Sequence, residues 1–287
     1  MEKIKLFKRK STSEIIVFSI AFCVILLHCL IILYIYLYGV NASFRESNSA
    51  FMRDPNKLAV ELNFRNYLKA FSIFKIGTTN FFGLIWNTIW QTALGTFISL
   101  GTATCSTYCV AKYKCKFTKF IFNLVLFIMV FPVYGSGVAS YKLYHALGMV
   151  NTPFLFLTGL NNMCHLMIYA FFVSIPWTYA EAAMIDGAGH FKIFYKIMLP
   201  MVWPSLCVLL VSSIMGGWND YMTSMVYMTE YPTLAYGLYV YEELSKYNAN
   251  KPVYFAGVVI SMIPPMILYY GMQNTIMEKV HFGGLKG

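Results

Sequence analysis

The sequence has little charge for its length. Of its 287 residues, 12% are Asp, Glu, Lys or Arg, whereas 58% are hydrophobic, and the mean hydropathy is +0.58. A water-soluble domain of this size could not hide so much apolar surface in one core, whereas lipid can cover it. Several stretches of about 20 residues, the length of helix that spans a bilayer, carry few or no charges. The composition therefore predicts a polytopic membrane protein.

Acidic residues are scarcer than basic ones, 12 against 22, and the formal net charge is +10. The excess Lys and Arg lie in short loops beside apolar stretches, where membrane proteins commonly carry them. No nucleic-acid-binding motif accompanies them, so we expect no nucleic-acid partner. The apolar stretches also lack the clustered His, Asp or Glu of a membrane-embedded enzyme. They lack the relay of buried ionisable groups that an ion-coupled carrier needs.

Cysteine is present in an odd number, seven, and its positions are scattered. Most lie in or beside apolar stretches and are expected to be small buried residues rather than a disulfide framework. The neighbouring pair Cys164-His165 lacks the spaced partners of a zinc site, so we expect no metal. No G-x-x-x-x-G-K-[ST] motif is present, and the sequence at 283–287 lacks the spacing of a phosphate loop. We expect this chain to hold no cofactor and to catalyse no reaction.

Six apolar stretches predict an all-α membrane protein with six transmembrane helices, at 15–40, 82–111, 119–140, 153–175, 202–226 and 253–276. The first follows a basic tail at 1–14; it is longer than the apolar region of a signal peptide and lacks a cleavage pattern, so we expect it to be retained. The remaining parts are a polar segment at 41–79, a core at 80–277 with five of the six helices, and a short tail at 278–287.

The distribution of Lys and Arg predicts the orientation of the chain. With the N-terminus in the cytoplasm, thirteen of these residues lie inside and nine outside, and the external ones are spread through longer segments. Short loops carry most weight in this rule. We therefore expect a multi-pass protein of the inner (cytoplasmic) membrane with both termini in the cytoplasm and the 41–79 segment outside.

A polar, helix-patterned segment at 177–200 separates the fourth and fifth predicted helices. It opens with an alanine-rich, strongly helix-forming stretch. Gly187 then allows a bend that a residue with a Cβ would resist. A second helical stretch at 189–198 is expected to stop at Leu199-Pro200, because proline lacks the N–H to continue a helix. Such a knob suits the groove of another protein; the alternative, an interfacial amphipathic helix pair, needs no glycine at a fixed place.

The same segment resembles a loop of the permease subunits of type I ABC importers, with the pattern E-A-A, three residues, G, nine residues, I-x-L-P. The matching residues are Glu181, Ala182, Ala183, Gly187, Ile197, Leu199 and Pro200. The resemblance implies that the segment docks into a cleft of a separate ATPase and that Glu181 pairs with a basic residue there. The residues expected to dock are Glu181, Ala182, Ala183, Asp186, Gly187, Ala188, Ile197, Leu199 and Pro200.

The resemblance narrows to the carbohydrate importers of the maltose type. The supporting motifs, in chain order, are Asn63-Phe64-Arg65-Asn66-Tyr67, Asn87-Thr88, Ile175-Pro176, Trp218-Asn219 and Gly283-Gly284-Leu285-Lys286-Gly287. The resemblance implies import of a sugar, expected to be an oligosaccharide, delivered by an external solute-binding protein. It also implies a sister permease, expected to be a different chain, and ATPase subunits that bind ATP and Mg. In this family the tail reaches towards the ATPase, which gives Lys286 and Gly287 a possible contact.

Asp220 is the one acid that falls within a predicted span, and intramembrane acids are functional candidates. With Trp218 and Asn219 it places an aromatic face beside hydrogen-bonding groups, which would suit a sugar pathway. The alternative is that Asp220 lies at the external end of the span and meets water or a loop. A non-sugar cargo, such as a peptide, amino acid or polyamine, stays open at this point, and an ion-coupled carrier is the more distant alternative.

Overall fold

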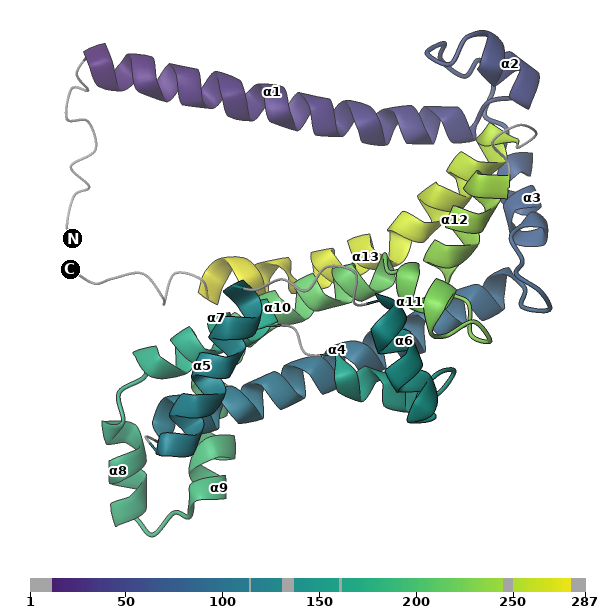
Figure 1. Cartoon of the computed structure of the whole chain (residues 1–287). Coiled ribbons are helices and arrows are strands. Elements are labelled where there is room, and N and C mark those ends of the chain that lie inside the picture. Colours follow the sequence, from purple (N-terminus) through teal and green to yellow (C-terminus); the bar gives the residue numbers. More distant parts are fainter. Residues whose placement is uncertain (1–11, 114, 131–136, 160–161, 245–249, 280–287) are drawn as a thin grey trace. The chain divides into compact units, whose positions relative to one another are not determined.

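The computed structural model describes residues 12–113, 115–130, 137–159, 162–244 and 250–279. In these ranges the regular elements are all helical, and the only β feature is an isolated bridge between Ile76 and Thr79. The elements in Figure 1 are α1 (Thr12–Ser43), α2 (Asn48–Arg53), α3 (Arg65–Ile73), α4 (Phe81–Lys112), α5 (Lys116–Val130), α6 (Gly137–Ala146), η1 (Pro153–Thr158), α7 (Asn162–Ser174), α8 (Thr178–Ile185), α9 (His190–Ile193), η2 (Phe194–Met198), α10 (Leu199–Trp218), α11 (Met222–Val226), α12 (Leu234–Leu244) and α13 (Lys251–Lys279).

Three described helices are long and apolar enough to cross a membrane: Thr12–Ser43, His190–Trp218 and Lys251–Gln273. A fourth candidate is the pair Met163–Ser174 and Thr178–Ile185, if its 63° bend is taken as a break within one span. The helix α4 has the length to span but not the composition, because amide and hydroxyl side chains interrupt its apolar sequence. The described residues thus support a multi-pass membrane protein.

The third and fourth predicted helices differ from the observed elements. One helix was predicted at 119–140, but two helices are described in this region. The first, α5, begins before residue 119, and the second, α6, begins at Gly137. The residues between them lie outside the described part of the chain. The prediction of one helix over 153–175 is wrong at its start, because Pro153–Thr158 forms the 3₁₀ helix η1 and α7 begins only at Asn162. Pro153 fits a first turn, and tight i→i+3 bonds close η1 at Gly159.

The prediction that helix 189–198 stops at Leu199-Pro200 is also wrong. The helix runs on from His190 to Trp218 through the π-helical segment η2. There the Leu199 N–H donates to the carbonyl of Phe194, five residues back. Pro200 falls in the first turn of α10, where its missing N–H is tolerated. The helix then ends at Trp218, not at 226, and the short helix α11 follows as a separate element.

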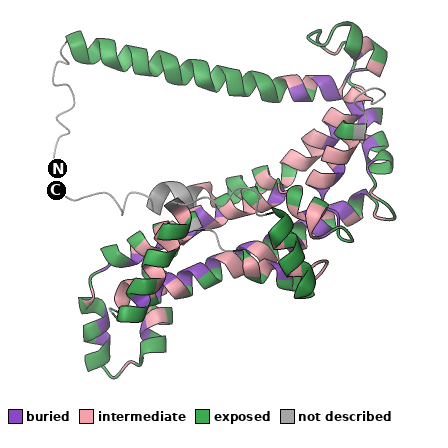
Figure 2. Ribbon diagram, viewed as in Figure 1, coloured by how far each residue is buried: buried purple, intermediate pink, exposed green. Residues whose placement is uncertain are grey.

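One compact unit of the chain comprises Met1–Ala70 and Ser245–Ile260. In its described part, residues Thr12–Leu37 of α1 are all exposed (Figure 2), so lipid or another chain must cover this apolar helix. The turn after α1 is built on the buried Arg45. Its guanidinium donates to the carbonyls of Ala50, Asp54 and Lys57 at 2.7, 2.9 and 2.9 Å. Because this buried cation donates hydrogen bonds to backbone carbonyls, it orders the segment that follows α1.

The second unit comprises Phe71–Leu244 and Ser261–Gly287. Its described core is built around α4, which packs along α7 and α10. Side chains from the second half of α4, from α7 and from the 180–210 region form one apolar cluster, whose fully buried members include Ala103, Ile168, Phe172, Ile193 and Met198. This cluster lies at the same end of α4 as the 177–200 segment, so that segment is anchored on the core of the unit.

Candidate functional site

The bend predicted at Gly187 is a left-handed helix cap. Gly187 has φ +76°, and its N–H donates to the carbonyl of Met184 at 3.0 Å. The Ala188 N–H donates to the carbonyl of Ala183 at 2.9 Å. These two bonds form a Schellman motif at the end of α8, in which glycine is favoured because it has no Cβ. In this motif the alanines therefore belong to the last turns of α8, and the glycine is the residue that caps the helix.

We call residues 177–200 the elbow. Its arms α8 and α9 lie side by side, joined by the turn at Gly187 (Figure 1). Ile175-Pro176 separates α8 from α7, because the residue before proline disfavours helical geometry. One face of each arm is buried in the apolar cluster through Ala183 and Ile193. The small Ala183 is thus the inner side of the motif, where it allows close packing.

The other face of the elbow is exposed and carries large apolar side chains among charged ones. Ile185 is 87% exposed and Phe191 80% exposed, and the Tyr195 side chain is exposed as well. Glu181 and Asp186 lie on the same exposed arm, α8 and its cap. A rigid surface that combines two large apolar side chains with two carboxylates is suited to a partner with an apolar groove and basic groups at its edge.

The remaining residues predicted to dock divide between the two faces. Ala182 and Pro200 are exposed, whereas Ala188, Ile197 and Leu199 are partly buried against the apolar cluster. The last two therefore hold the second arm in place rather than forming its outer surface. The predicted tail contacts, Lys286 and Gly287, lie outside the described residues.

The end of α4 holds the elbow. The Lys112 ammonium donates to the carbonyl of Ile175 at 2.6 Å, where the chain leaves α7. The Tyr113 hydroxyl lies 2.9 Å from Nδ1 of His190, the first residue of α9. Tyr108 packs on Phe194 with ring centroids 4.7 Å apart. The second arm of the elbow and the end of α7 are therefore both held by the C-terminal end of α4, a connection that the sequence analysis did not identify.

The first half of α4 binds a different segment through its polar face. The amides of Asn87 and Gln91 donate to the carbonyls of Pro232 and Tyr231 at 3.0 and 2.6 Å. The hydroxyl of Thr88 accepts the N–H of Leu234 at 2.8 Å. These side chains satisfy the backbone of the irregular connection between α11 and α12, which would otherwise carry unpaired groups in an apolar environment.

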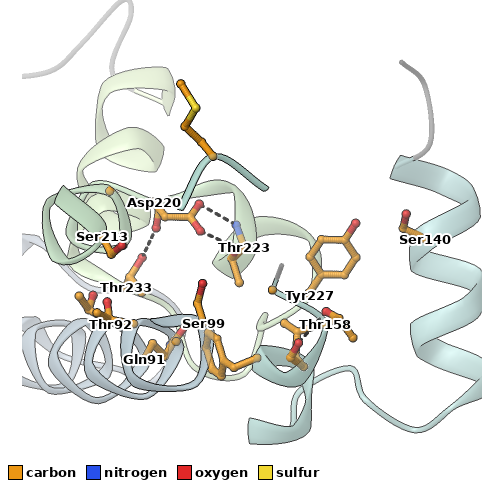
Figure 3. Close-up of a pocket in the computed structure, with 18 of the residues that line it drawn as sticks. Gln91, Thr92, Ser99, Ser140, Thr158, Ser213, Asp220, Thr223, Tyr227 and Thr233 are labelled. Carbon is orange, nitrogen blue, oxygen red and sulfur yellow. Dashed lines mark hydrogen bonds between the residues drawn. The ribbon is translucent and has the colours of Figure 1, made fainter. Parts of the chain in front are cut away.

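Beyond these contacts the polar face of α4 lines a cavity of about 1070 Å³ (Figure 3). Its polar lining includes Gln91, Thr92, Thr96, Ser99, Ser213 and Asp220, and its aromatic lining includes Tyr144, Phe156 and Tyr227. The volume is at the upper end of the range for small-ligand sites, which are typically about 300–1,000 Å³. The cavity is thus a candidate binding site within this unit.

The three residues predicted to line the pathway lie in three different environments. Asp220 lines the cavity, and its carboxylate accepts from the N–H and hydroxyl of Thr223 at 3.1 and 2.5 Å. It lies after the end of α10 and not within a helix. Trp218 is buried and donates to the Ser261 carbonyl at 3.0 Å, and Asn219 is exposed; neither belongs to the lining.

The sequence analysis missed most of the lining, yet a signal was present. Gln91, Thr92, Gly95, Thr96 and Ser99 recur at intervals of three and four residues, which places them on one face of a helix. Among the described residues no group of three or more His, Cys, Asp or Glu could hold a metal ion. The site therefore offers hydroxyl, amide and aromatic groups together with one carboxylate.

Comparison with known proteins relates the chain to membrane transport. The family profile described as "Binding-protein-dependent transport system inner membrane component" matches residues 95–281. The diacetylchitobiose uptake system permease protein NgcG of Streptomyces coelicolor is 27% identical over 97% of this chain and 92% of its own length. The maltodextrin transport system permease protein MalD of Streptococcus pneumoniae is 28% identical over 90% of this chain and 91% of its own length.

Solved structures share the fold. A chain of a bacterial ABC transporter involved in the import of the acidic polysaccharide alginate superposes with a TM-score of 0.78 and 22% identity, covering 93% of this chain and 99% of that one. A chain of the MetNI methionine ABC transporter, in an inward-facing conformation, gives a TM-score of 0.53 and 15% identity over 68% of this chain and 94% of that one.

Proposed function

The chain belongs to the binding-protein-dependent transport system inner membrane components, and from this premise we propose that it is one half of the translocation pathway of an ATP-driven oligosaccharide importer. In this proposal the chain spans the membrane six times, with both termini and the elbow in the cytoplasm. It has no catalytic role; ATP and Mg bind to a separate ATPase. Its other partners are a sister permease, expected to be a different chain, an external solute-binding protein and the lipid bilayer.

The elbow is the single observation that carries the proposal. Its inner face is anchored on the apolar cluster, its bend is fixed by a glycine cap, and its outer face exposes Ile185 and Phe191 beside Glu181 and Asp186. A rigid surface that exposes large apolar side chains, left uncovered by the described part of the chain, is what a docking partner needs. We propose that the partner is the ATPase, and that Lys286 and Gly287 add a second contact to it.

The coupling route follows from the contacts of α4. The middle of this helix lines the cavity, and its C-terminal end makes the hydrogen bonds that hold the elbow in place. A movement of the elbow imposed by the ATPase would therefore move the wall of the cavity as a rigid body, since a packed helix transmits displacement along its axis. Alternation between two packings would open the cavity to one side of the membrane and then to the other.

The cargo is inferred from the relatives and from the cavity. Relatives of this chain are named for the uptake of diacetylchitobiose and of maltodextrin, and the cavity is lined by hydroxyl, amide and aromatic groups. Sugars present hydroxyl groups and flat apolar faces, and side chains of these kinds match both. An oligosaccharide is the cargo that we propose.

The direct test is the double variant Glu181→Lys with Gly187→Pro, expressed with the partner subunits. Proline fixes φ near −65°, which is incompatible with the positive φ at 187, and the lysine reverses the charge of the outer face. We expect normal membrane insertion together with loss of ATPase co-purification and of oligosaccharide uptake. The control is Gly189→Ala, at a residue with φ −72° and open space around the added methyl group. Unchanged uptake in the double variant would refute the docking role.

A further inference from the structure

The apolar side chains that follow α2 are more exposed than those of the long helix α1. Val60 is 83% exposed and Leu58 75%, whereas no large apolar side chain of α1 exceeds 67%. Met52, Leu62 and Phe64 are exposed in the same way. Water-exposed surfaces rarely gather so many apolar side chains in one short segment unless something binds there. All of these residues belong to the unit that contains α1.

This segment is held in a fixed place beside the last turn of α1. The Asn41 side chain donates to the carbonyl of Lys57 at 3.1 Å and accepts the N–H of Ala59 at 2.7 Å. Arg45 donates to the carbonyls of Lys57 and Leu58 at 2.9 and 3.3 Å. Because Asn41 lies inside α1, the chain around Leu58 lies alongside the helix rather than beyond its end. Hydrogen bonds therefore impose the exposure of these apolar side chains.

The helix α2 lies at the same level of α1 (Figure 1). The Phe51 ring lies 6.5 Å from that of Tyr38 and 5.8 Å from that of Phe255, measured between centroids. Tyr38 and Phe255 are themselves 5.8 Å apart, so the three rings form one cluster. Met52 and Arg53, the next residues of α2, therefore lie close to the part of α1 that holds Tyr38. Both pieces of the segment flank the last two turns of α1.

This level of α1 is the interface of the membrane. Residues 15–37 contain no Asp, Glu, Lys or Arg and extend roughly 34 Å at 1.5 Å per residue, slightly more than the hydrocarbon core of about 30 Å. Tyr34 and Tyr36 are exposed near the end of this run, and tyrosine is typical of the layer between acyl chains and water. Residues 38–43 therefore lie in the headgroup layer, and the segment beside them lies there too.

The first part of α3 extends the same surface. Its buried Asn66 donates to the carbonyls of Ser43 and Arg45, both at 2.8 Å, and Leu68 is exposed. Basic residues outnumber acidic ones among the exposed residues at 52–69, which are Arg53, Lys57, Arg65 and Lys69 against Asp54 and Glu61. Exposed apolar side chains combined with Lys and Arg are typical of protein surfaces that lie in a membrane interface, where cations meet lipid phosphates.

From these observations we propose that residues 52–69, which we call the anchor surface, bind phospholipid. Its apolar side chains enter the headgroup layer at the C-terminal end of α1, and its basic side chains contact phosphate groups. This inference goes beyond the proposed function and takes from it only the orientation, which makes the leaflet the outer one. A solute-binding protein is the competing occupant. The position of the anchor surface alongside α1, rather than beyond its end, favours lipid.

The test places an environment-sensitive fluorophore on a cysteine introduced at Val60 in a cysteine-free background. The whole transporter is reconstituted in nanodiscs whose lipids carry a nitroxide quencher near the top of the acyl chain. We expect the fluorophore to lose most of its emission in these nanodiscs, and addition of the solute-binding protein to leave the emission unchanged. The control is the same label at Ile185, an apolar residue of the elbow that is 87% exposed; it should keep its emission.

The phosphate contact is tested with the quencher on phosphatidylglycerol or on phosphatidylcholine. With the label at position 60, we expect phosphatidylglycerol to quench more strongly at equal content, because it adds negative charge to the leaflet. Lys57→Glu should lower this preference about fivefold, the effect of one basic side chain near an anionic surface. Lys119→Glu is the matched control, the same change at an exposed lysine of α5, and should leave the preference unchanged.

Three results would overturn the proposal. The label at position 60 could keep its emission in quencher nanodiscs, its emission could respond to the solute-binding protein and not to lipid, or Lys57→Glu and Lys119→Glu could act alike. The proposed function fails separately. If the ATPase does not co-purify with the wild-type chain, or if the label at position 185 is quenched by lipid, the docking role of the elbow is wrong and the anchor surface stands.

Discussion

At the scale of single residues, Gly187 fixes the direction in which the chain leaves α8. The sequence predicted a bend here, and the structure gives its physical cause, a Schellman cap at φ +76°. The cap sets the four-residue spacing between Ala183 and Gly187, and close packing favours a small side chain at position 183. Ala183 supplies the carbonyl that closes the cap and is packed in the apolar cluster at the same time.

Replacing Gly187 should therefore act through the backbone rather than through contacts. An added Cβ would meet nothing within 4 Å, but a left-handed φ costs a residue with a Cβ about 1 kcal/mol. We expect Gly187→Ala to lower the melting temperature of the purified chain by about 2–4 °C. Gly187→Asn should lower it less, since asparagine tolerates this region. Equal melting temperatures for the wild-type and alanine proteins would contradict the capping argument.

Other site residues could not be recognised from sequence type alone. Trp218-Asn219 matched a family motif, yet the indole is buried against the Ser261 carbonyl and only the adjoining Asp220 lines the cavity. Thr92 is one of many threonines, and its burial depends on the close approach of Gly217 from a helix more than a hundred residues later. Such placement depends on tertiary packing, which local sequence does not encode.

At the scale of elements, α4 combines three functions along one helix. Its first half binds the 231–234 backbone, its middle lines the cavity, and its end holds the elbow. The sequence predicted the bounds of this helix closely, at 82–111 against Phe81–Lys112. It did not predict that the second arm of the elbow continues into α10, because the π turn that accommodates Pro200 shifts the hydrogen bonds by one residue.

The contact at the end of α4 predicts a specific loss of stability. Lys112 donates to the carbonyl of Ile175, and partial burial lowers the pKa of its ammonium group. Lys112→Met removes the donor and leaves that carbonyl unpaired, which should cost about 1 kcal/mol and lower the melting temperature. Lys119→Met, at an exposed lysine on the next helix, should leave it unchanged. If the two variants lowered the melting temperature equally, the loss of positive charge, and not the loss of the hydrogen bond to Ile175, would account for the lost stability.

At the scale of the whole molecule, the proposed orientation places the elbow and Cys115 on the cytoplasmic side. The distribution of Lys and Arg along the sequence predicted this orientation. The exposed Cys115 offers a direct test. Hydrogen bonding with the side chain and backbone of Thr118 lowers the pKa of the Cys115 thiol, so the thiolate forms at a lower pH than in an ordinary cysteine.

A variant that keeps only Cys115 should be labelled by a membrane-impermeant maleimide in inside-out vesicles and protected in intact cells. A cysteine introduced at the exposed Glu61 in a cysteine-free background should give the opposite pattern. Because the folded pKa lies below the ordinary value, the labelling rate of Cys115 should reach half its plateau at a lower pH than that of the introduced cysteine. Labelling of both cysteines from the same side would contradict the topology.

The central claim is that the outer face of the elbow binds the ATPase, and cross-linking from that face tests it most directly. A photoreactive phenylalanine analogue is placed at Ile185, which is 87% exposed, and in a control at Leu58, which is 75% exposed in the other unit. Irradiation of the assembled transporter should yield an adduct with the ATPase from position 185 and none from position 58. An elbow that cross-links only to lipid, or to the external solute-binding protein, would contradict the account.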